Sequence, residues 1–202
     1  MVRVDSEDRR WLTQEHEAHA LEGAAARLAQ ADVCVLCDYA KGVVTPRLAR
    51  TVIEMARQDS KPVVVDPKGV DFAKYAGATL VTPNSDETAR AAGVEIEVED
   101  DLWRAAARLM ETLGESRLLV TRGPRGMSLF QDGRVTHLPT EARTVFDITG
   151  AGDTVVAMLA LALAAGAPLA AAARLANRAA GIVVGKVGTA TVSLAELAAG
   201  VR

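Results

Sequence analysis

Four short, continuously apolar runs constrain the fold of this chain more than any other feature. They span residues 33–37, 62–65, 79–82 and 117–121, and turn residues follow each of them. Apolar side chains that do not alternate with polar ones indicate strands covered on both faces. Because these strands alternate with helical segments, the sequence predicts an α/β fold with a mostly parallel sheet and helices on both of its faces.

The segments between the strands carry helical periodicity. We expect helices over 6–30, 46–58, 85–92, 100–113, 153–165 and 168–185, and a short last helix from Ser193. Residues 127–130 and 135–138 flank Asp132-Gly133, which is a hairpin signal. With 202 residues, half of them apolar, the chain is long enough to form one domain with its own core.

Polar clusters follow all four predicted strands. They are Asp38–Gly42, Asp66–Gly69, Pro83–Glu87 and Thr121–Gly123. The C-terminal ends of parallel strands meet along one edge of a sheet, where ligands bind in α/β proteins. Each cluster alone fits a turn or a helix cap, but together they predict a site for an anion and a metal.

The segment 147–153, with the sequence DITGAGD, runs directly into an apolar helical stretch. A Gly-x-Gly turn that opens a helix presents N–H groups to an anion at the positive end of the helix dipole. Asp153 adds a carboxylate beside that position. This arrangement suits phosphoryl transfer, because N–H groups stabilise the phosphoryl charge and a carboxylate takes the proton of the attacking hydroxyl. The alternative is a tight strand-to-helix turn capped by an aspartate.

Three other patterns indicate ordinary structure. Cys34 and Cys37 lie three apart in a predicted strand, so their thiols point to opposite faces and are poorly placed to share a metal. His16 and His19 lack the i, i+4 spacing of a zinc-binding helix and fit a solvated helix. Residues 154–173 are uncharged and long enough to span a bilayer, but a Gly-Ala-Pro break divides them into two buried helices.

The two motifs described above resemble those of a known family. The segment 147–153 resembles the C-terminal signature of the ribokinase, or PfkB, carbohydrate kinases, and Asn84–Glu87 resembles their N-x-x-E motif, which organises Mg²⁺ and the ATP phosphates. Both occur in the family's order and near its spacing. The chain is also similar to the family's D-glycero-β-D-manno-heptose 7-phosphate kinase branch. The segments that carry this similarity are 38–42, 66–72, 77–84 and 184–192.

The resemblance implies an activity. It is the transfer of the ATP γ-phosphoryl group to the anomeric hydroxyl of heptose 7-phosphate, a step toward ADP-heptose and lipopolysaccharide. Within this reaction Asp153 is the general base on the sugar hydroxyl, and Gly150, Ala151 and Gly152 form the anion hole. The other residues assigned to ATP are Asn84, Ser85, Asp86, Glu87, Thr121, Arg122, Gly123, Gly126 and Asn177.

Metal and substrate roles are implied in the same way. Asn84 and Glu87 hold Mg²⁺ through water. Asp147 and the loop at Gly188 lie where many family members hold a monovalent cation such as K⁺. The residues assigned to the substrate are Asp38, Lys41, Asp66 and Lys68, with the two lysines meeting its phosphates.

The start of the chain departs from the family. Family members are longer, and their N-terminal part carries the first strands, much of the sugar site and a β-sheet lid. We therefore expect residues 1–202 to form a single, incomplete ribokinase-like kinase domain with impaired activity, lacking as well the adenylyltransferase domain of the bifunctional heptose enzymes. The alternatives are another sugar kinase of the family, or a nucleotide-binding fragment without catalysis.

The expected partners are ATP and a small sugar phosphate, together with either a second copy of the chain or the missing N-terminal segment. A net charge of −3 argues against a nucleic-acid or anionic-membrane partner. No basic-then-apolar leader opens the chain, which predicts a cytoplasmic location.

Overall fold

A computed structural model describes residues 7–142 and 144–199 of the chain. Its centre is a six-stranded sheet in which the strands follow one another in sequence order. The strands are β1 (Cys34–Cys37), β2 (Val63–Asp66), β3 (Leu80–Val81), β4 (Arg117–Thr121), β5 (Met127–Gln131) and β6 (Arg134–Leu138). The first four are parallel, and β5 and β6 add an antiparallel hairpin beside β4. The predicted mostly parallel sheet is confirmed.

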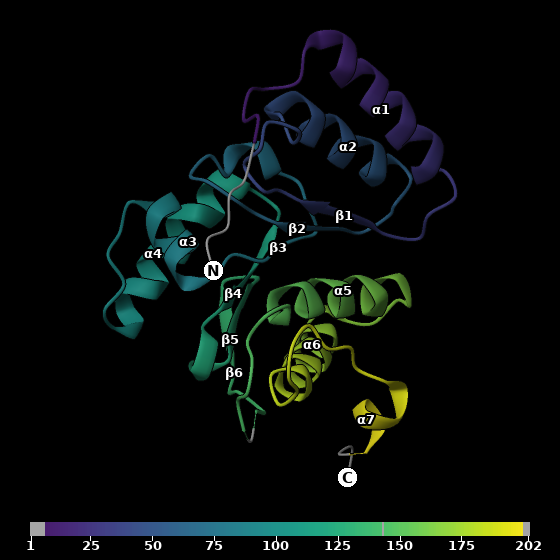
Figure 1. The fold of residues 1–202 in the computed structure, drawn as a ribbon. Helices are drawn as coiled ribbons and strands as arrows, with labels where there is room; N and C mark the ends of the chain where they lie inside the picture. Colours follow the sequence, from purple (N-terminus) through teal and green to yellow (C-terminus); the bar gives the residue numbers. More distant parts are fainter. Residues whose placement is uncertain (1–6, 143, 200–202) are drawn as a thin grey trace.

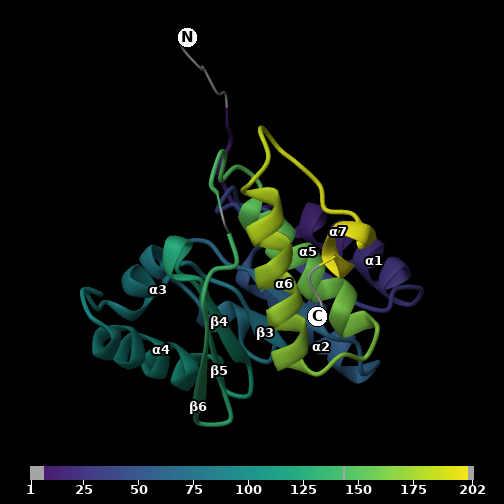
Figure 2. The ribbon, with the colours of Figure 1, turned by 90° about the horizontal axis from the view of Figure 1, so that it is seen from below.

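Helices cover both faces of this sheet (Figures 1 and 2). On one face lie α2 (Pro46–Gln58), α3 (Ser85–Ala92) and α4 (Glu99–Leu113), with α1 (Gln14–Leu28) packed on α2. On the other face lie α5 (Ala151–Ala164) and α6 (Leu169–Val183), followed by the short α7 (Leu194–Ala198). Single 3₁₀ turns, η1 (Ala73–Tyr75) and η2 (Gly123–Arg125), complete the regular structure. None of the helices in the described ranges is long and apolar enough to cross a membrane.

The core explains why the strand sequences do not alternate. Val63 and Val65 on β2 pack toward α2 and α4, whereas Val64 between them packs toward α5 and α6. All three side chains are fully buried, as are Leu118 and Leu119 on β4. A strand between two helical layers has no solvent face, so every position is apolar.

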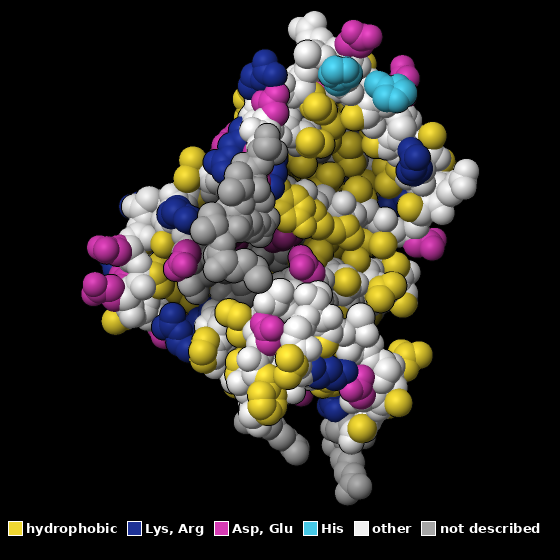
Figure 3. Space-filling model, in the orientation of Figure 1, with side chains coloured by type: hydrophobic (Ala, Val, Ile, Leu, Met, Phe, Trp, Pro, Cys, Tyr) yellow, Lys and Arg dark blue, Asp and Glu magenta, His cyan; other side chains and the backbone are white. Residues whose placement is uncertain are grey.

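Strand β1 corrects one prediction. The run 33–37 was expected to be covered on both faces, but Val35 is 39% exposed and Cys37 is exposed as well. Within the described ranges β1 pairs with β2 alone, so it forms an edge of the sheet. Apolar side chains gather on the surface around α1, α2 and this edge (Figure 3).

Two helices begin two or more residues away from the predicted position. Helix α1 begins at Gln14, because the side chain of Thr13 accepts a hydrogen bond from the N–H of His16 and so caps the helix. Helix α5 begins at Ala151, two residues earlier than expected, with Gly150 in a left-handed conformation at φ 78° as its N-cap. Asp153 is therefore the third residue of α5, within its first turn.

Candidate active site

The N-terminus of α5 lies beside the ends of the central strands. The N–H of Ala151 bonds to the carbonyl of Ile148 at 3.2 Å, which closes the turn before the helix. Gly152 and Asp153 follow in the first turn, where N–H groups have no acceptor within the helix itself. Of the predicted anion hole, Gly152 is thus better placed to meet a ligand than Ala151. The side chain of Asp153 is exposed to solvent.

Asp147 holds this turn in place. Its carboxylate accepts the N–H of Thr149 at 2.9 Å and the N–H of Gly188 at 3.2 Å, so it joins the turn to the loop after α6. Hydrogen bonds from Thr149 lower the pKa of the Asp147 carboxyl, with a further contribution from Gly188. Both oxygens already serve the protein, and the carboxylate stays ionised because these donors favour its charged form.

A second helix N-terminus, that of α3, faces the same region. The Asn84 side chain accepts the N–H of Glu87 at 2.8 Å, and the Glu87 side chain accepts the N–H of Asn84 at 2.9 Å. This reciprocal capping box explains why the helix begins at Ser85. Glu87 is only 3% exposed, and its carboxylate is engaged in this cap.

Acidic groups surround Lys68, an exposed lysine of this rim. The ammonium group of Lys68 lies 2.6 Å from Glu87 Oε1. Burial first, and then the charges of Glu87, Asp153 and Asp38, raise the pKa of the Asp66 carboxyl to about 6, against an opposing effect of Lys68. The ends of β1, β2 and β3 and the start of α5 therefore place their carboxylates within electrostatic reach of one another.

Replacing Asp66 with asparagine should stabilise the ligand-free protein at neutral pH. The folded protein keeps the Asp66 proton up to about pH 6, whereas the ordinary pKa is 3.8, so ionisation of Asp66 costs stability as pH rises across that interval. Since the group is partly exposed, we expect a gain of about 1 kcal/mol, or roughly 2–4 °C in Tm, above about pH 7. The gain should vanish below about pH 3, where both states are protonated. Thermal melts at the two pH values test this.

One cavity of about 490 Å³ lies between the turn after β4, the start of α5 and the middle of α6. Seven of the sequence-predicted residues line it, namely Asn84, Thr121, Gly123, Gly126, Ala151, Gly152 and Asn177. Asn177 is 5% exposed, and its amide donates to the carbonyl of Pro139 at 2.7 Å, which anchors the chain after β6 to α6. An isolated bridge between Asn84 and Thr121 keeps the ends of β3 and β4 together.

Sequence reasoning missed the apolar wall of this cavity. It consists of Pro124, Met127, Thr140, Ala142, Val145, Ile148, Val155, Ala180, Gly181 and Val184. Apolar and small residues carry no motif, so only the packing of α6 and the segment 139–148 against β4 reveals them.

Several predicted ligand-binding side chains turn away from the cavity. Arg122 is buried, where it pairs with Glu99 on α4 and donates to the hydroxyl of Ser128 at 3.0 Å. Lys41 pairs with Glu7 at 2.7 Å. In the α3 motif, Ser85 and Asp86 do not line the cavity, and Asp86 is exposed.

Asp38 is also occupied by the protein itself. It is 3% exposed, and its carboxylate accepts the ammonium group of Lys74, the hydroxyl of Tyr75 at 2.6 Å and the N–H of Ala40 at 2.7 Å. The expected substrate contact is therefore replaced by a bracing role, because a buried carboxylate with three donors has little capacity for a ligand.

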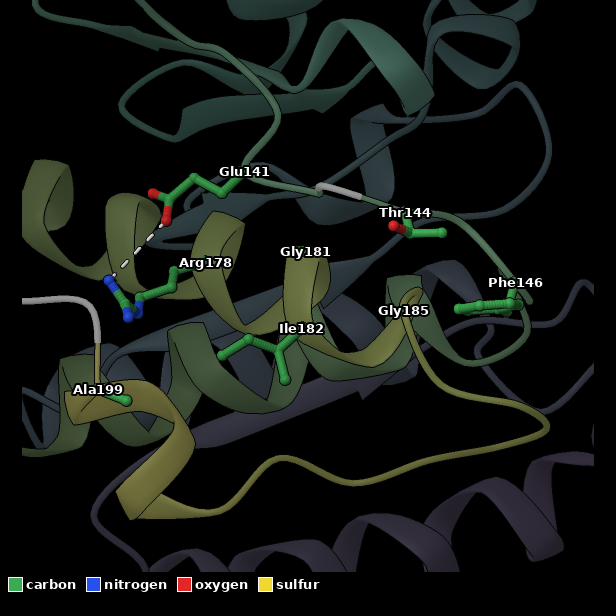
Figure 4. Close-up of a pocket in the computed structure, with 8 residues that line it drawn as sticks. All are labelled: Glu141, Thr144, Phe146, Arg178, Gly181, Ile182, Gly185 and Ala199. Atoms are coloured by element: carbon green, nitrogen blue, oxygen red, sulfur yellow. Dashed lines mark ion pairs between the residues drawn. The ribbon is translucent and has the colours of Figure 1, made fainter.

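A second cavity, of about 620 Å³, lies between α6 and the chain that follows β6 (Figure 4). The residues that line it are Glu141, Thr144, Phe146, Arg178, Gly181, Ile182, Gly185 and Ala199. Arg178 and Glu141 form a long ion pair at 4.0 Å across it. Among the residues that the structure describes, only Gly181 lines both cavities, and a Cβ there would lie 2.9 Å from the backbone nitrogen of Ala142. Four of the predicted glycine and alanine positions and Asn84, Thr121 and Asn177 line the first cavity, and Asp153 directly follows Gly152, so we take this cavity as the candidate site. None of these residues lines the second cavity.

Replacing Gly152 with alanine separates ligand binding from stability. A Cβ at Gly152 meets no atom within 4 Å, so alanine should stabilise α5 by up to about 1 kcal/mol. The added methyl group should nevertheless weaken ATP binding, because Gly152 lines the cavity at the helix terminus. Gly150→Ala is the control: at φ 78° it should lose about 1 kcal/mol of stability. Melts without ligand and calorimetry with ATP measure both effects. Unchanged affinity in Gly152→Ala would place the phosphates away from α5.

Comparison with known proteins identifies the family of the chain. The model of the pfkB family carbohydrate kinases matches residues 1–196. The chain is 50% identical over 198 residues to the bifunctional protein HldE of Geobacter sulfurreducens and 52% identical to that of Geobacter metallireducens. Each match covers 98% of this chain and 40% of the relative, so the chain spans about two fifths of the relatives' length.

Solved structures share the fold. Escherichia coli phosphofructokinase-2, in complex with potassium, superposes with a TM-score of 0.77 at 20% identity, over 93% of this chain and 61% of the other. An Arabidopsis thaliana ribokinase complexed with ribose and ATP superposes with a TM-score of 0.70 at 24% identity, over 89% of this chain and 55% of the other. With the family model matching nearly the whole sequence, the chain belongs to the pfkB family of carbohydrate kinases.

Proposed function

We propose that this chain carries the nucleotide site and the catalytic base of an ATP-dependent sugar-phosphate kinase. The observation that carries the proposal is that the turn after β4 and the first turn of α5 line the same cavity. Asp153 directly follows Gly152, one of the lining residues. The apolar wall of the cavity suits the adenine ring of ATP, and the N–H groups at the start of α5 suit its phosphates.

The reaction requires a positioned hydroxyl and an acceptor for its proton. In the proposed step the sugar oxygen attacks the γ-phosphorus, the bond from that phosphorus to the bridging oxygen breaks, and ADP leaves with the bond electrons. Asp153 takes the hydroxyl proton, which makes the attacking oxygen a better nucleophile. Gly152 and its neighbours stabilise the negative charge on the transferring group through their N–H groups.

The donor set at the rim fits a divalent cation. Glu87 is a buried carboxylate that already holds a positive group at 2.6 Å, and oxygen donors are those that Mg²⁺ prefers. No group of three or more His, Cys, Asp or Glu in residues 7–142 and 144–199 is arranged to hold a metal. Mg²⁺ would therefore rely on Asn84 and Glu87, on water and on the ATP phosphates, whose charge it neutralises when bound. Asp147 and the Gly188 loop are the proposed place for a monovalent cation.

We further propose heptose 7-phosphate as the substrate, phosphorylated at its anomeric hydroxyl in the cytoplasm on the route to ADP-heptose and lipopolysaccharide. The resemblance to the heptose 7-phosphate kinase branch supports this choice, as does the identity to proteins named HldE. Asp66 and Lys68, at the rim beside Asp153, are the proposed contacts to the sugar phosphate.

An ADP-release assay tests the proposal. ATP and Mg²⁺ are supplied with heptose 7-phosphate, ribose or fructose 6-phosphate, and the full-length HldE of Geobacter sulfurreducens serves as positive control. Turnover with heptose 7-phosphate above the other sugars supports the proposal. Faster turnover of another sugar would identify that sugar as the substrate in place of heptose 7-phosphate. ATP binding without turnover of any sugar would favour a nucleotide-binding fragment.

The exposed edge of β1 leads to expectations for the behaviour of the isolated chain. Val35 and Cys37 are open to solvent there, and an unpaired strand edge recruits another strand. We expect the 202-residue chain to bind ATP with Mg²⁺, to turn over far more slowly than the full-length relative, and to self-associate. Calorimetry and light scattering on both proteins measure this. Turnover equal to that of the full-length relative would contradict it.

A further inference from the structure

Lys68 and Glu87 form an ion pair whose two side chains differ in their exposure to solvent. The Glu87 side chain is 4% exposed, whereas the Lys68 side chain is 48% exposed, and the two charged groups lie 2.6 Å apart. A buried carboxylate without a counter-charge is costly, so Glu87 requires a positive group at this position. A half-exposed lysine, in contrast, loses little when its ammonium group moves back into water.

Glu87 has one oxygen available for that positive group. Its Oε2 accepts the N–H of Asn84 at 2.9 Å within the capping box, and Oε1 accepts the ammonium group of Lys68. The carboxylate is thus fixed in orientation by the cap, with Oε1 directed outward toward whichever cation is present.

The backbone of Lys68 is held independently of its side chain. Its N–H donates to the hydroxyl oxygen of Tyr75 at 3.3 Å, and that hydroxyl donates to Asp38 at 2.6 Å. Lys74 completes this buried cluster by pairing with Asp38. The cluster anchors the start of the Lys68 side chain, so only the flexible aliphatic part and the ammonium group need move.

We infer that the Lys68 ammonium group holds the place of a divalent cation at Glu87 Oε1 in the ligand-free protein. Binding of the cation at Glu87 releases Lys68, whose charge then becomes available to an anionic substrate at the same rim. The cation and the anionic substrate would consequently bind with positive coupling, because each favours the state in which Lys68 has left Glu87. This inference rests on the proposed function for the identity of its ligands.

A matched pair elsewhere on the chain serves as control. Lys41 is 49% exposed and lies 2.7 Å from Glu7, so it resembles Lys68 in exposure and pairing distance. Glu7, however, is 23% exposed, and solvent can neutralise its charge when the lysine is removed. Only the pair with the buried glutamate should respond to a metal.

The test uses Mg²⁺ alone, without nucleotide or sugar, and reads the Tm at constant ionic strength. Lys68→Met leaves Glu87 without its cation, so its Tm should fall in chelator, and millimolar Mg²⁺ should raise it by at least about twice the rise seen in the parent. Lys41→Met should respond as the parent does. The double variant Lys68→Met with Glu87→Gln should lose the response, while glutamine retains the capping box. Equal Mg²⁺ responses in Lys68→Met and the parent would overturn the inference.

A measurement on the unaltered side chain covers the case in which Lys68→Met does not fold. The lysine ammonium NMR signal of Lys68, assigned by its loss in Lys68→Arg, should shift on addition of Mg²⁺ to the parent and stay unshifted in Glu87→Gln. An unshifted signal in the parent at saturating Mg²⁺ would overturn the inference. Since neither experiment includes a sugar or ATP, failure here leaves the proposed kinase reaction to be judged by its own assay.

Discussion

Replacing Asp153 with asparagine should lower phosphoryl transfer by ~10² to 10⁴-fold relative to the unaltered protein. Asp153 is the third residue of α5 and directly follows Gly152, which lines the cavity. Asparagine retains the size and the exposed position but cannot accept the hydroxyl proton. ATP affinity should change little, because the N–H groups that meet the phosphates are unaltered.

The control for this variant is an exposed aspartate in the first turn of another helix. Asp100 is exposed in the first turn of α4, away from the cavity, and Asp100→Asn should leave turnover and ATP affinity at parent values. Steady-state kinetics and ATP calorimetry on both variants separate catalysis from binding. Turnover of Asp153→Asn within a few-fold of the parent would remove Asp153 from the catalytic role.

Replacing Gly126 with alanine should have the largest effect on stability. The backbone at Gly126 has φ 78° and ψ −128°, and a Cβ there would lie 2.0 Å from the carbonyl oxygen of Leu138. That neighbour is backbone of β6, which cannot move without breaking the hairpin ladder. We expect a loss of about 3–5 kcal/mol, from strain and displacement together.

Gly123 offers the matched comparison in the same turn. It too has a positive φ, of 55°, but a Cβ there meets no atom within 4 Å. Gly123→Ala should therefore lose only about 1–2 kcal/mol, the cost of the left-handed backbone alone. Urea unfolding of both variants measures the difference, which isolates the contact with β6. Equal losses would mean that the hairpin yields to the added methyl group.

Local signals made much of the fold predictable. The helices Pro46–Gln58 and Ser85–Ala92 and the strand Arg117–Thr121 have the bounds that the sequence predicts. Each is delimited by nearby residues: Thr45 caps α2, Asn84 caps α3, and Gly93 ends α3 at φ 61°. A helix or strand boundary that depends on capping or turn residues three or four positions away can be predicted from the sequence alone.

Pairings between distant residues could not be read in this way. Asp38 meets Lys74 and Tyr75 across 36 and 37 positions, and Arg122 meets Glu99 across 23. The family resemblance suggested ligand contacts for Asp38 and Arg122, which both follow predicted strands. Which charged group turns inward depends on partners that only the folded chain brings together.

The wall between the two cavities is a single layer of backbone at one point. Gly181 faces both hollows, and the chain at Glu141 and Ala142 lies directly against it. The volumes of the two cavities are therefore linked. A shift of this wall that widens one cavity narrows the other. If the first cavity were widened for a bulkier ligand, the second cavity would narrow, and α6 would pack more tightly against α7.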